Sequence, residues 1–242
     1  MNNDGMAPLK RFRACTGLDF MVDQHIHSEW TDGKGSIDQI QQCAKEAGLN
    51  RIAITDHVRR TSTYWEAYLR ATHALTDQSG LSVLAGFEAK IVDYDGNLDI
   101  AADCAREADF LIGSVHSLPG PQGFMQPHQV PHEILEKKEY ELSLALIRSR
   151  QAPVLGHPGG MSLAVLGKFN KDYMEEIIQT CASQDVAFEI NAKYHEPLLE
   201  WLLEKLFQYN PPVSLGSDAH DPIEIGKCAA LMKKRWKNHE KA

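Results

Sequence analysis

The sequence predicts an α/β barrel in which parallel strands alternate with helices. About seven short apolar runs alternate with longer amphipathic segments along the 242 residues, which is the pattern of parallel βα units. A histidine, aspartate or glutamate stands at the end of each apolar run, and side chains at the carboxyl ends of parallel strands converge on one end of a barrel. Since such residues follow the first and last runs as well, a closed or nearly closed barrel is favoured over an open sheet.

Each expected element rests on a local pattern of residue types. Ser36 and Gln39 form a capping-box pattern at the start of the first helix, and Gly48 ends it. Several Pro and Gly residues without a clear period predict a loop over residues 117–130. Apolar runs predict strands over residues 18–24, 51–55, 81–85, 109–113, 153–155, 186–190 and 213–215, and helical periodicity predicts helices over residues 36–47, 63–78, 99–107, 131–150, 171–183, 197–208 and 222–237.

The length and net charge of the chain indicate its domain organisation and the kind of partner it binds. The chain suits one domain over residues 18–242, preceded by a polar N-terminal tail over residues 1–17. The net charge of −8 argues against a large nucleic-acid footprint. An acidic protein that handles anionic substrates needs local positive charge, and bound divalent metals supply it. We therefore expect a small anionic ligand rather than nucleic acid, and the oligomeric state cannot be read.

Cysteine usage and hydropathy indicate the compartment. The five cysteines are widely spaced and form no CxxC pair, which suggests a reducing compartment rather than a disulfide framework. No apolar run approaches the length of a membrane span. The opening stretch MNNDGMAPLKRFRAC lacks the apolar segment of a signal peptide. The expected location is the cytoplasm, without a membrane partner.

The residues at the strand ends have the chemistry of metal ligands. His25 and His27 alternate along an extended segment, so both imidazoles lie on one side of it, and Asp218 with His220 repeats this spacing. Glu88 follows an apolar run, and a buried carboxylate there requires a cationic partner. Imidazole and carboxylate without thiolate indicate hard or borderline divalent metals. The strand-end residues are His25, His27, His57, Glu88, His116, His157, Glu189, Asp218 and His220.

Each of these residues also has a structural interpretation. A lone histidine is more often a core or surface residue, but independent core histidines have no reason to recur at the same place in successive units. Asp32 is either a ligand or part of an Asp-Gly turn. Asp23 and Asp56 either orient imidazoles from outside the ligand set or are solvated surface residues. An outer role also stays open for His195.

These stretches, in this order, resemble the polymerase and histidinol phosphatase (PHP) superfamily of metal-dependent phosphoesterases. The matching stretches are DQHIHSEWTDGKGSIDQIQQCAKEAGLNRIAITDH, GFEAK, IGSVH, LGHPG, EINAK and GSDAH, from Asp23 to His220. The resemblance implies a distorted (β/α)7, TIM-like barrel with a trinuclear site for zinc, manganese or iron. The opening motif departs from the family at Gln24, where Leu is frequent.

The resemblance also implies how the three divalent ions are shared. Glu88 bridges two of them, and the Asp32 position varies in the family between Asp and His. The implied groups are His25, His27, Glu88 and Asp218 at one ion, Glu88, His116 and His157 at the second, and His57, His220 and Asp32 at the third.

The expected function is hydrolysis of a small-molecule phosphate monoester by metal-activated water. Glu88, Asp218 and His220 are the expected catalytic residues, and no Ser or Cys nucleophile is required. Histidinol phosphate, a nucleotide and a sugar phosphate are candidate substrates; the group that protonates the leaving oxygen is left open. Arg59, Arg60 and Lys193 are expected to bind substrate, with solvated loop charges as the alternative.

Three other functions are weighed against this one. A 3′ exonuclease-type phosphodiesterase acting on DNA is the nearest, but the negative charge disfavours it. Amidohydrolase barrels also begin with HxH, but they commonly use a carboxylated Lys as the bridge, and Glu88 stands at that position. A catalytically silent PHP domain kept for structure or partner binding is the third, although such domains usually lose ligands and this set looks complete.

Overall fold

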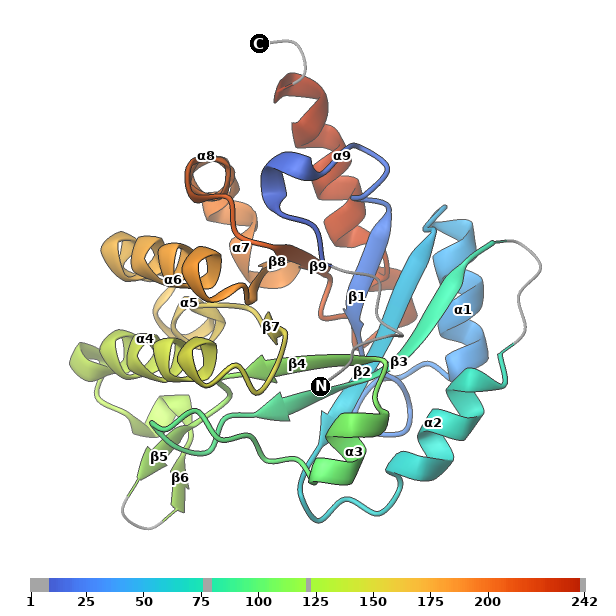
Figure 1. Ribbon diagram of the computed structural model, residues 1–242, viewed down its shortest axis with the longest axis horizontal. Coiled ribbons are helices and arrows are strands. Elements are labelled where there is room, and N and C mark those ends of the chain that lie inside the picture. The colour runs from blue at the N-terminus through green and yellow to red at the C-terminus, as the bar shows by residue number, and fades with distance from the viewer. Residues whose placement is uncertain (1–8, 76–79, 121–122, 240–242) are drawn as a thin grey trace.

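The computed structural model describes residues 9–75, 80–120 and 123–239. Its parallel sheet has the order β1-β2-β3-β4-β7-β8-β9 and curls into a nearly closed barrel (Figure 1). This confirms the predicted α/β barrel. The strands are β1 (Val22–Ile26), β2 (Arg51–Val58), β3 (Ser82–Lys90), β4 (Phe110–Ser114), β7 (Val154–Leu155), β8 (Ala187–Asn191) and β9 (Val213–Gly216).

The barrel closes between β1 and β9 through a few contacts. Ile26 and Ala219 form a single parallel bridge, and the His27 amide donates to the Ala219 carbonyl at 2.9 Å. The Asp23 carboxylate accepts from the amide of Ser217 at 2.9 Å and from that of Gly226 at 2.8 Å. Asp23 therefore anchors the segment after β9 and does not orient an imidazole.

The predicted division into a tail over residues 1–17 and a domain over residues 18–242 stays a prediction. Residues 1–8 lie outside the described part of the chain. In the part that is described, Phe12 is buried, and its amide donates to the Pro211 carbonyl at 2.9 Å.

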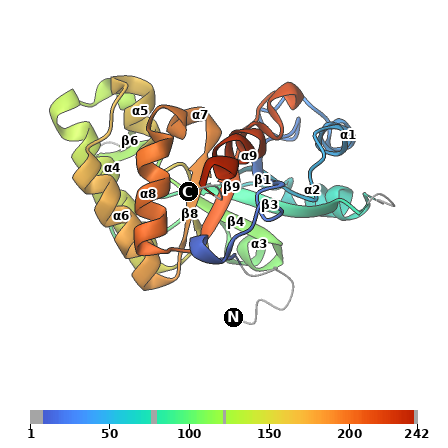
Figure 2. The same ribbon diagram turned by 90° about the horizontal axis from the view of Figure 1, so that it is seen from above.

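Helices pack around the barrel. Figures 1 and 2 show α4, α6 and α8 side by side on one side of the molecule and α1 and α2 on the other, while α9 contacts β1 and β9. The predicted capping box at Ser36 is present in full. The helices are α1 (Ile37–Glu46), α2 (Trp65–His73), α3 (Ala102–Glu107), α4 (His132–Ser149), α5 (Gly160–Leu166), α6 (Lys171–Gln184), α7 (Ala192–His195), α8 (Leu199–Tyr209) and α9 (Lys227–His239).

Several boundaries differ from the prediction. The first strand begins at Val22 rather than at residue 18, because the Asp19 carboxylate accepts from the Thr16 amide and hydroxyl and holds a turn. The predicted helix over residues 222–237 is split into a short 3-10 turn at Pro222–Glu224 and α9, with Gly226 at φ 81° between them. Part of the predicted helix over residues 63–78 lies outside the described residues.

The prediction of a loop over residues 117–130 is wrong in part. An antiparallel hairpin forms there from β5 (Leu118–Gly120) and β6 (Gly123–Met125), and a 3-10 turn follows at Pro127–Gln129. Leu118 is buried in the core. The strands are only three residues long, too short to show an alternating pattern.

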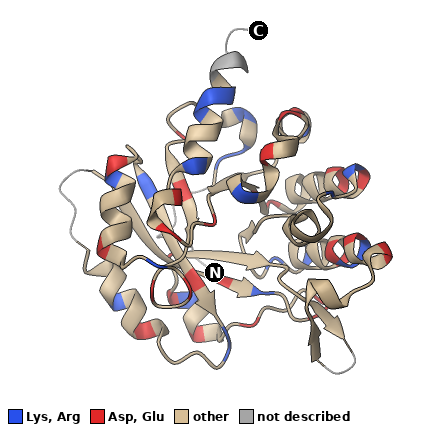
Figure 3. Cartoon of the chain, turned by 180° about the vertical axis from the view of Figure 1, so that it is seen from behind, with Lys and Arg blue, Asp and Glu red and all other residues tan. Residues whose placement is uncertain are grey.

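The outer surface is charged in a mixed manner. Acidic and basic side chains are interspersed along the outer helices, and Lys and Arg are frequent on α9 (Figure 3). Among the residues that the structure describes, no helix is both long enough and apolar enough to cross a membrane.

Candidate metal centre

All nine residues predicted to hold metal come together at the carboxyl ends of the strands. His57 and Glu88 are still within β2 and β3, since these strands continue beyond their predicted ends, and the two residues are direct partners in the register. The other predicted ligands lie in β1 or in the segments that follow strands. The ligand atoms approach within 4.8 Å of one another in four groups: His27, Asp32, His57 and His220; His25, Glu88 and His157; His25, His27 and Asp218; His57, Glu88 and His116.

Glu88 is the hub of this cluster. Its carboxylate is buried and lies 2.9 Å from His157 Nε2, 3.0 Å from His116 Nε2 and 3.0 Å from His57 Nδ1. Burial raises the pKa of Glu88, but His116 and His25 outweigh burial, so its pKa falls well below the usual range. The carboxylate is therefore ionised and faces imidazoles from four strands or strand ends, as a bridging ligand must.

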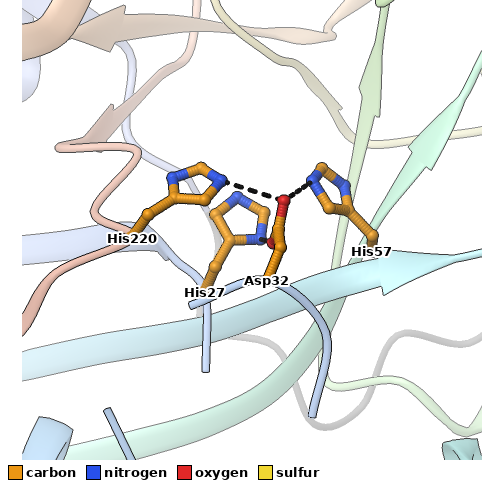
Figure 4. A group of neighbouring side chains, drawn as sticks. All are labelled: His27, Asp32, His57 and His220. Atoms are coloured by element: carbon orange, nitrogen blue, oxygen red, sulfur yellow. Dashed lines mark ion pairs between the residues drawn. The ribbon is translucent and has the colours of Figure 1, made fainter. Parts of the chain in front are cut away.

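The outer part of the cluster opens toward solvent. His27, His57 and His220 point toward the carboxylate of Asp32 (Figure 4). Asp32 Oδ2 lies 3.3 Å from His57 Nε2 and 3.4 Å from His220 Nε2, and its side chain is 52% exposed. The loop that carries Asp32 is fixed by Asp56, which accepts from the amide of Ser28 and the hydroxyl of Thr31.

Three buried ring nitrogens show that these residues fit a metal. His25 Nε2 and both ring nitrogens of His27 are buried and have no hydrogen-bond partner among the described residues. A buried polar atom without a partner costs free energy. Burial lowers the pKa of His27 to about 4, so the imidazole is neutral and its lone pair is available. Divalent cations among these nitrogens and the nearby carboxylates would satisfy them.

Glu189 supports the cluster from behind. It accepts from His25 Nδ1 at 2.7 Å, and its other oxygen accepts from the amide of His157. Glu189 belongs to none of the ligand groups; it orients His25 so that Nε2 faces the cluster. Burial lowers the pKa of His25, but Glu189 and Glu88 outweigh burial and raise it well above the usual range.

Two further buried residues hold the segment that carries His157. His195 Nδ1 accepts from the amide of Asn191 at 3.0 Å, and His195 Nε2 lies 2.9 Å from the Pro158 carbonyl. Glu139 of α4 accepts from the amides of Met161 and Ser162 at 2.9 and 2.8 Å, at the first turn of α5. His195 is therefore a structural brace with both ring nitrogens engaged.

The backbone is strained at two of the predicted ligands. His157 has φ 27° and Asp218 has φ 54°, backbone angles that residues other than glycine rarely adopt. Such conformations cost about 1–3 kcal/mol each and cluster at functional sites, where the surrounding structure imposes them.

The predicted substrate contacts lie near the open side. Lys193 Nζ pairs with Asp218 Oδ2 at 2.9 Å. Arg59 and Arg60 directly follow β2 and are exposed. Burial lowers the pKa of Lys90, Asp99 opposes this effect, and Arg59 adds to it.

The PHP domain family model matches residues 23–193, which is more than half of the chain. The chain belongs to the PHP domain family. A probable phosphatase of Caldicellulosiruptor bescii is 27% identical over 225 residues, covering 88% of this chain and 85% of that protein. The DNA polymerase/3′-5′ exonuclease PolX of Bacillus subtilis is 26% identical, covering 88% of this chain but 37% of that longer protein.

Solved structures show the same fold. The histidinol phosphate phosphatase of Lactococcus lactis, complexed with zinc, L-histidinol and phosphate, superposes with a TM-score of 0.68 at 20% identity, over 88% of this chain and 92% of that one. A second solved structure, from Listeria monocytogenes, gives a TM-score of 0.67 at 18% identity, over 85% of this chain and 97% of that one. The PHP resemblance and the TIM-like fold are thus confirmed, and the chain is a hydrolase of the phosphatase type.

Sequence reasoning missed Glu139 and Lys90. Glu139 occupies a helical position between the buried Leu135 and Leu142, so a charged residue on an apolar helical face was its signal. Lys90 stands two residues after Glu88 and therefore on the same face of β3. No motif identifies either residue, because their partners come from distant segments.

Proposed function

We propose that this PHP-family phosphatase hydrolyses a small-molecule phosphate monoester at a site that holds three divalent ions. The observation that carries this proposal is the buried Glu88 carboxylate, surrounded by imidazoles. Beside it lie three buried ring nitrogens that have no hydrogen-bond partner in the described part of the chain. A purely structural cluster would satisfy these nitrogens internally.

We propose that all nine residues of the cluster are the metal ligands. Glu88 would bridge two ions, and Asp32 would complete the outer group with His57 and His220. Bound divalent ions supply Lewis-acid charge and lower the pKa of water. The native metal is zinc, manganese or iron; imidazole and carboxylate accept all three. The zinc in the Lactococcus structure supports the first of these.

The chain's own residues position the reacting groups. Glu88, Asp218 and His220 are the proposed catalytic residues, because each would hold an ion against the phosphate. Lys193 keeps one oxygen of Asp218 engaged at 2.9 Å, which fixes the other oxygen toward His27 Nε2 at 3.4 Å. Arg59, Arg60 and Lys193 are the proposed substrate contacts, since all three are cations near the exposed side of the cluster.

A monoester is favoured over DNA, although one observation supports a second candidate. The net charge of −8 disfavours a polyanionic strand. The similarity to a 3′-5′ exonuclease polymerase of Bacillus subtilis supports phosphodiester cleavage as the alternative. Digestion of labelled single-stranded DNA beside a monoester panel separates the two.

Chelation tests the proposed function. Protein of measured metal content is assayed on a panel of phosphate monoesters that includes histidinol phosphate, nucleotides and sugar phosphates. We expect phosphate release that is lost after dialysis against a chelator and regained with manganese or zinc. Activity that survives thorough chelation contradicts the metal-dependent mechanism. Full metal occupancy without turnover of any ester supports the silent-domain alternative.

A further inference from the structure

Two cations lie beyond the metal cluster toward the mouth of the barrel: Lys90 is the last residue of β3, and Arg59 directly follows β2. His57 of β2 is the register partner of Glu88 of β3, and Val58 is the partner of Ala89. Arg59 follows Val58 in the chain, and Lys90 follows Ala89. Side chains of a strand alternate between faces, so Lys90 leaves β3 on the same face as Glu88. Arg59 and Lys90 thus follow the His57–Glu88 pair toward the mouth of the barrel.

Neither cation is neutralised by an ion pair. In the described part of the chain, neither Arg59 nor Lys90 has a carboxylate within 4.0 Å, whereas Lys193 at the same mouth is paired with Asp218. Burial lowers the pKa of Lys90, and the negative charge of Asp99 opposes this effect without an ion pair. One oxygen of Asp99 accepts from the Arg60 amide at 3.0 Å. Arg59 and Lys90 carry like charges, and an anion bound between them reduces their repulsion.

The hairpin after β4 fixes the position of Lys90. Its Nζ lies 3.5 Å from the centroid of the Phe124 ring, on β6. Phe124 is 40% exposed and Lys90 is half-buried, so the ring contacts the ammonium at the edge of the protein surface. Lys90 is therefore held in place rather than free in solvent, and an ordered cation is a better binding group than a mobile one.

Glu88 and Lys90 are separated by two residues of strand, which is about 7 Å. A phosphate bound at the metal cluster therefore leaves Arg59 and Lys90 free for another group of the same molecule. We infer that the substrate is a phosphate monoester carrying a second anionic group, a carboxylate or a second phosphate, which Arg59 and Lys90 bind beside Phe124. This inference rests on the proposed function and narrows its substrate class. Histidinol phosphate, which carries an amine and an imidazole instead, does not fit this subsite.

Matched compounds with and without the second anion test the inference. In kinetics on the metal-loaded protein, 3-phosphoglycerate is compared with glycerol 3-phosphate, and fructose 1,6-bisphosphate with fructose 6-phosphate. For 3-phosphoglycerate and fructose 1,6-bisphosphate, which carry the second anionic group, we expect Lys90→Met to lower kcat/KM by about tenfold or more, mainly through KM. For glycerol 3-phosphate and fructose 6-phosphate, which lack that group, we expect a decrease of less than about twofold. Lys90→Arg should retain most of the preference. Lys171→Met, which removes a lysine 5.3 Å from the Trp201 ring, is the matched control and should change neither ratio.

Binding separates this inference from the proposed function. Calorimetry with two compounds that cannot be hydrolysed, 4-phosphonobutyrate and butylphosphonate, should show tighter binding of the carboxylate compound to the wild type and no such preference in Lys90→Met. The inference is overturned if Lys90→Met loses kcat/KM equally for both substrates of each pair. It is also overturned if the wild type binds the two phosphonates equally well. If the phosphonate preference holds while no ester is hydrolysed, the proposed hydrolysis fails and the subsite stands.

Discussion

Glu88 connects more of the candidate site than any other single residue. It lies within 4.0 Å of ring nitrogens of His25, His27, His57, His116 and His157, and all of these contacts are buried or half-buried. In the absence of cations its negative charge is balanced only by protons on the imidazoles. Metal binding replaces those protons, because imidazole must be deprotonated to act as a ligand.

Replacement of this carboxylate should remove the metals without unfolding the barrel. Glu88→Gln keeps the volume but loses the bridging charge. We expect a lower metal content and a loss of phosphate release of more than about 100-fold, since even outer partners of metal ligands account for about 10–100-fold. Elemental analysis and a phosphate assay measure this. Glu204→Gln, at an exposed position of α8, is the control; wild-type metal content in Glu88→Gln contradicts the bridging role.

At the residue scale, the candidate cluster was predictable because its members other than Asp32 stand at or just after the end of an apolar run. The same reasoning did not separate Glu189 from the ligands, since it also ends an apolar run. Its carboxylate is held by His25 and by the amide of His157, and this distinction depends on contacts across the barrel. The local TDGKG sequence fits either a turn or a ligand, and the approach of Asp32 to His57 and His220 is a contact between distant segments that the sequence does not show.

At the scale of elements, β9 makes room for the support of His25. A Cβ added to Gly216 would overlap Glu189 Oε1 and lie 2.5 Å from His25 Cβ. The carboxyl end of β9 therefore needs a residue without a side chain, so that the His25–Glu189 pair can form beside it.

A methyl group at this point should damage both stability and metal binding. We expect Gly216→Ala to lower the free energy of unfolding by about 1–3 kcal/mol through overpacking and to weaken metal affinity. Urea unfolding and competition with a chromogenic chelator measure the two effects. Gly17→Ala is the matched control, because its Cβ would have no neighbour closer than 4.0 Å. Unchanged metal affinity in Gly216→Ala would show that Glu189 does not need this position.

The junction between α4 and α5 should make stability depend on pH. Burial raises the pKa of Glu139 to about 7 from 4.5. The folded state therefore binds a proton more tightly than the unfolded state, so this stabilisation is complete below pH 4.5 and is lost as pH rises toward about 7.

Comparison with Glu139→Gln isolates this effect, since the amide does not titrate and all other groups are shared. The advantage of the wild type in free energy of unfolding should shrink by between about 2 and 3 kcal/mol from pH 5 to pH 8. Urea denaturation at the two pH values measures it. An advantage that is constant or grows with pH would mean that Glu139 is charged in the folded protein.

Long periodic segments were predicted well because their pattern spans several turns or a full strand. The short elements were not: α5 is seven residues long and begins at the second of two glycines, and the β5–β6 hairpin has strands of three residues. Both depend on tertiary contacts, Glu139 for α5 and Lys90 with Phe124 for the hairpin. Local patterns do not contain these partners.

At the scale of the whole molecule, the candidate metals would link strands that the sheet alone joins weakly. β1 pairs with the segment after β9 through a single bridge, yet His25, His27 and Asp218 bring ligand atoms from both ends of the sheet within 4.8 Å. The barrel and its closure were predictable because ligand-type residues follow both the first and the last runs. The N-terminal segment that reaches Pro211 was not, since its composition is polar.

Metal ions should therefore stabilise the whole barrel. A ligand at 100 times its dissociation constant adds about 2.7 kcal/mol, which for a chain of this size raises Tm by about 5–10 °C. Differential scanning calorimetry of chelator-treated protein with and without manganese or zinc measures the shift. Glu88→Gln should show a much smaller shift, and an equal shift in both proteins would place the stabilising ions elsewhere.

Anomalous diffraction from crystals of the metal-loaded protein tests the central claim most directly. We predict three anomalous peaks inside the cluster: one beside Asp32, His57 and His220, and one on each side of the Glu88 carboxylate. Peaks on the outer surface alone, or a fully loaded protein whose cluster holds none, would contradict it.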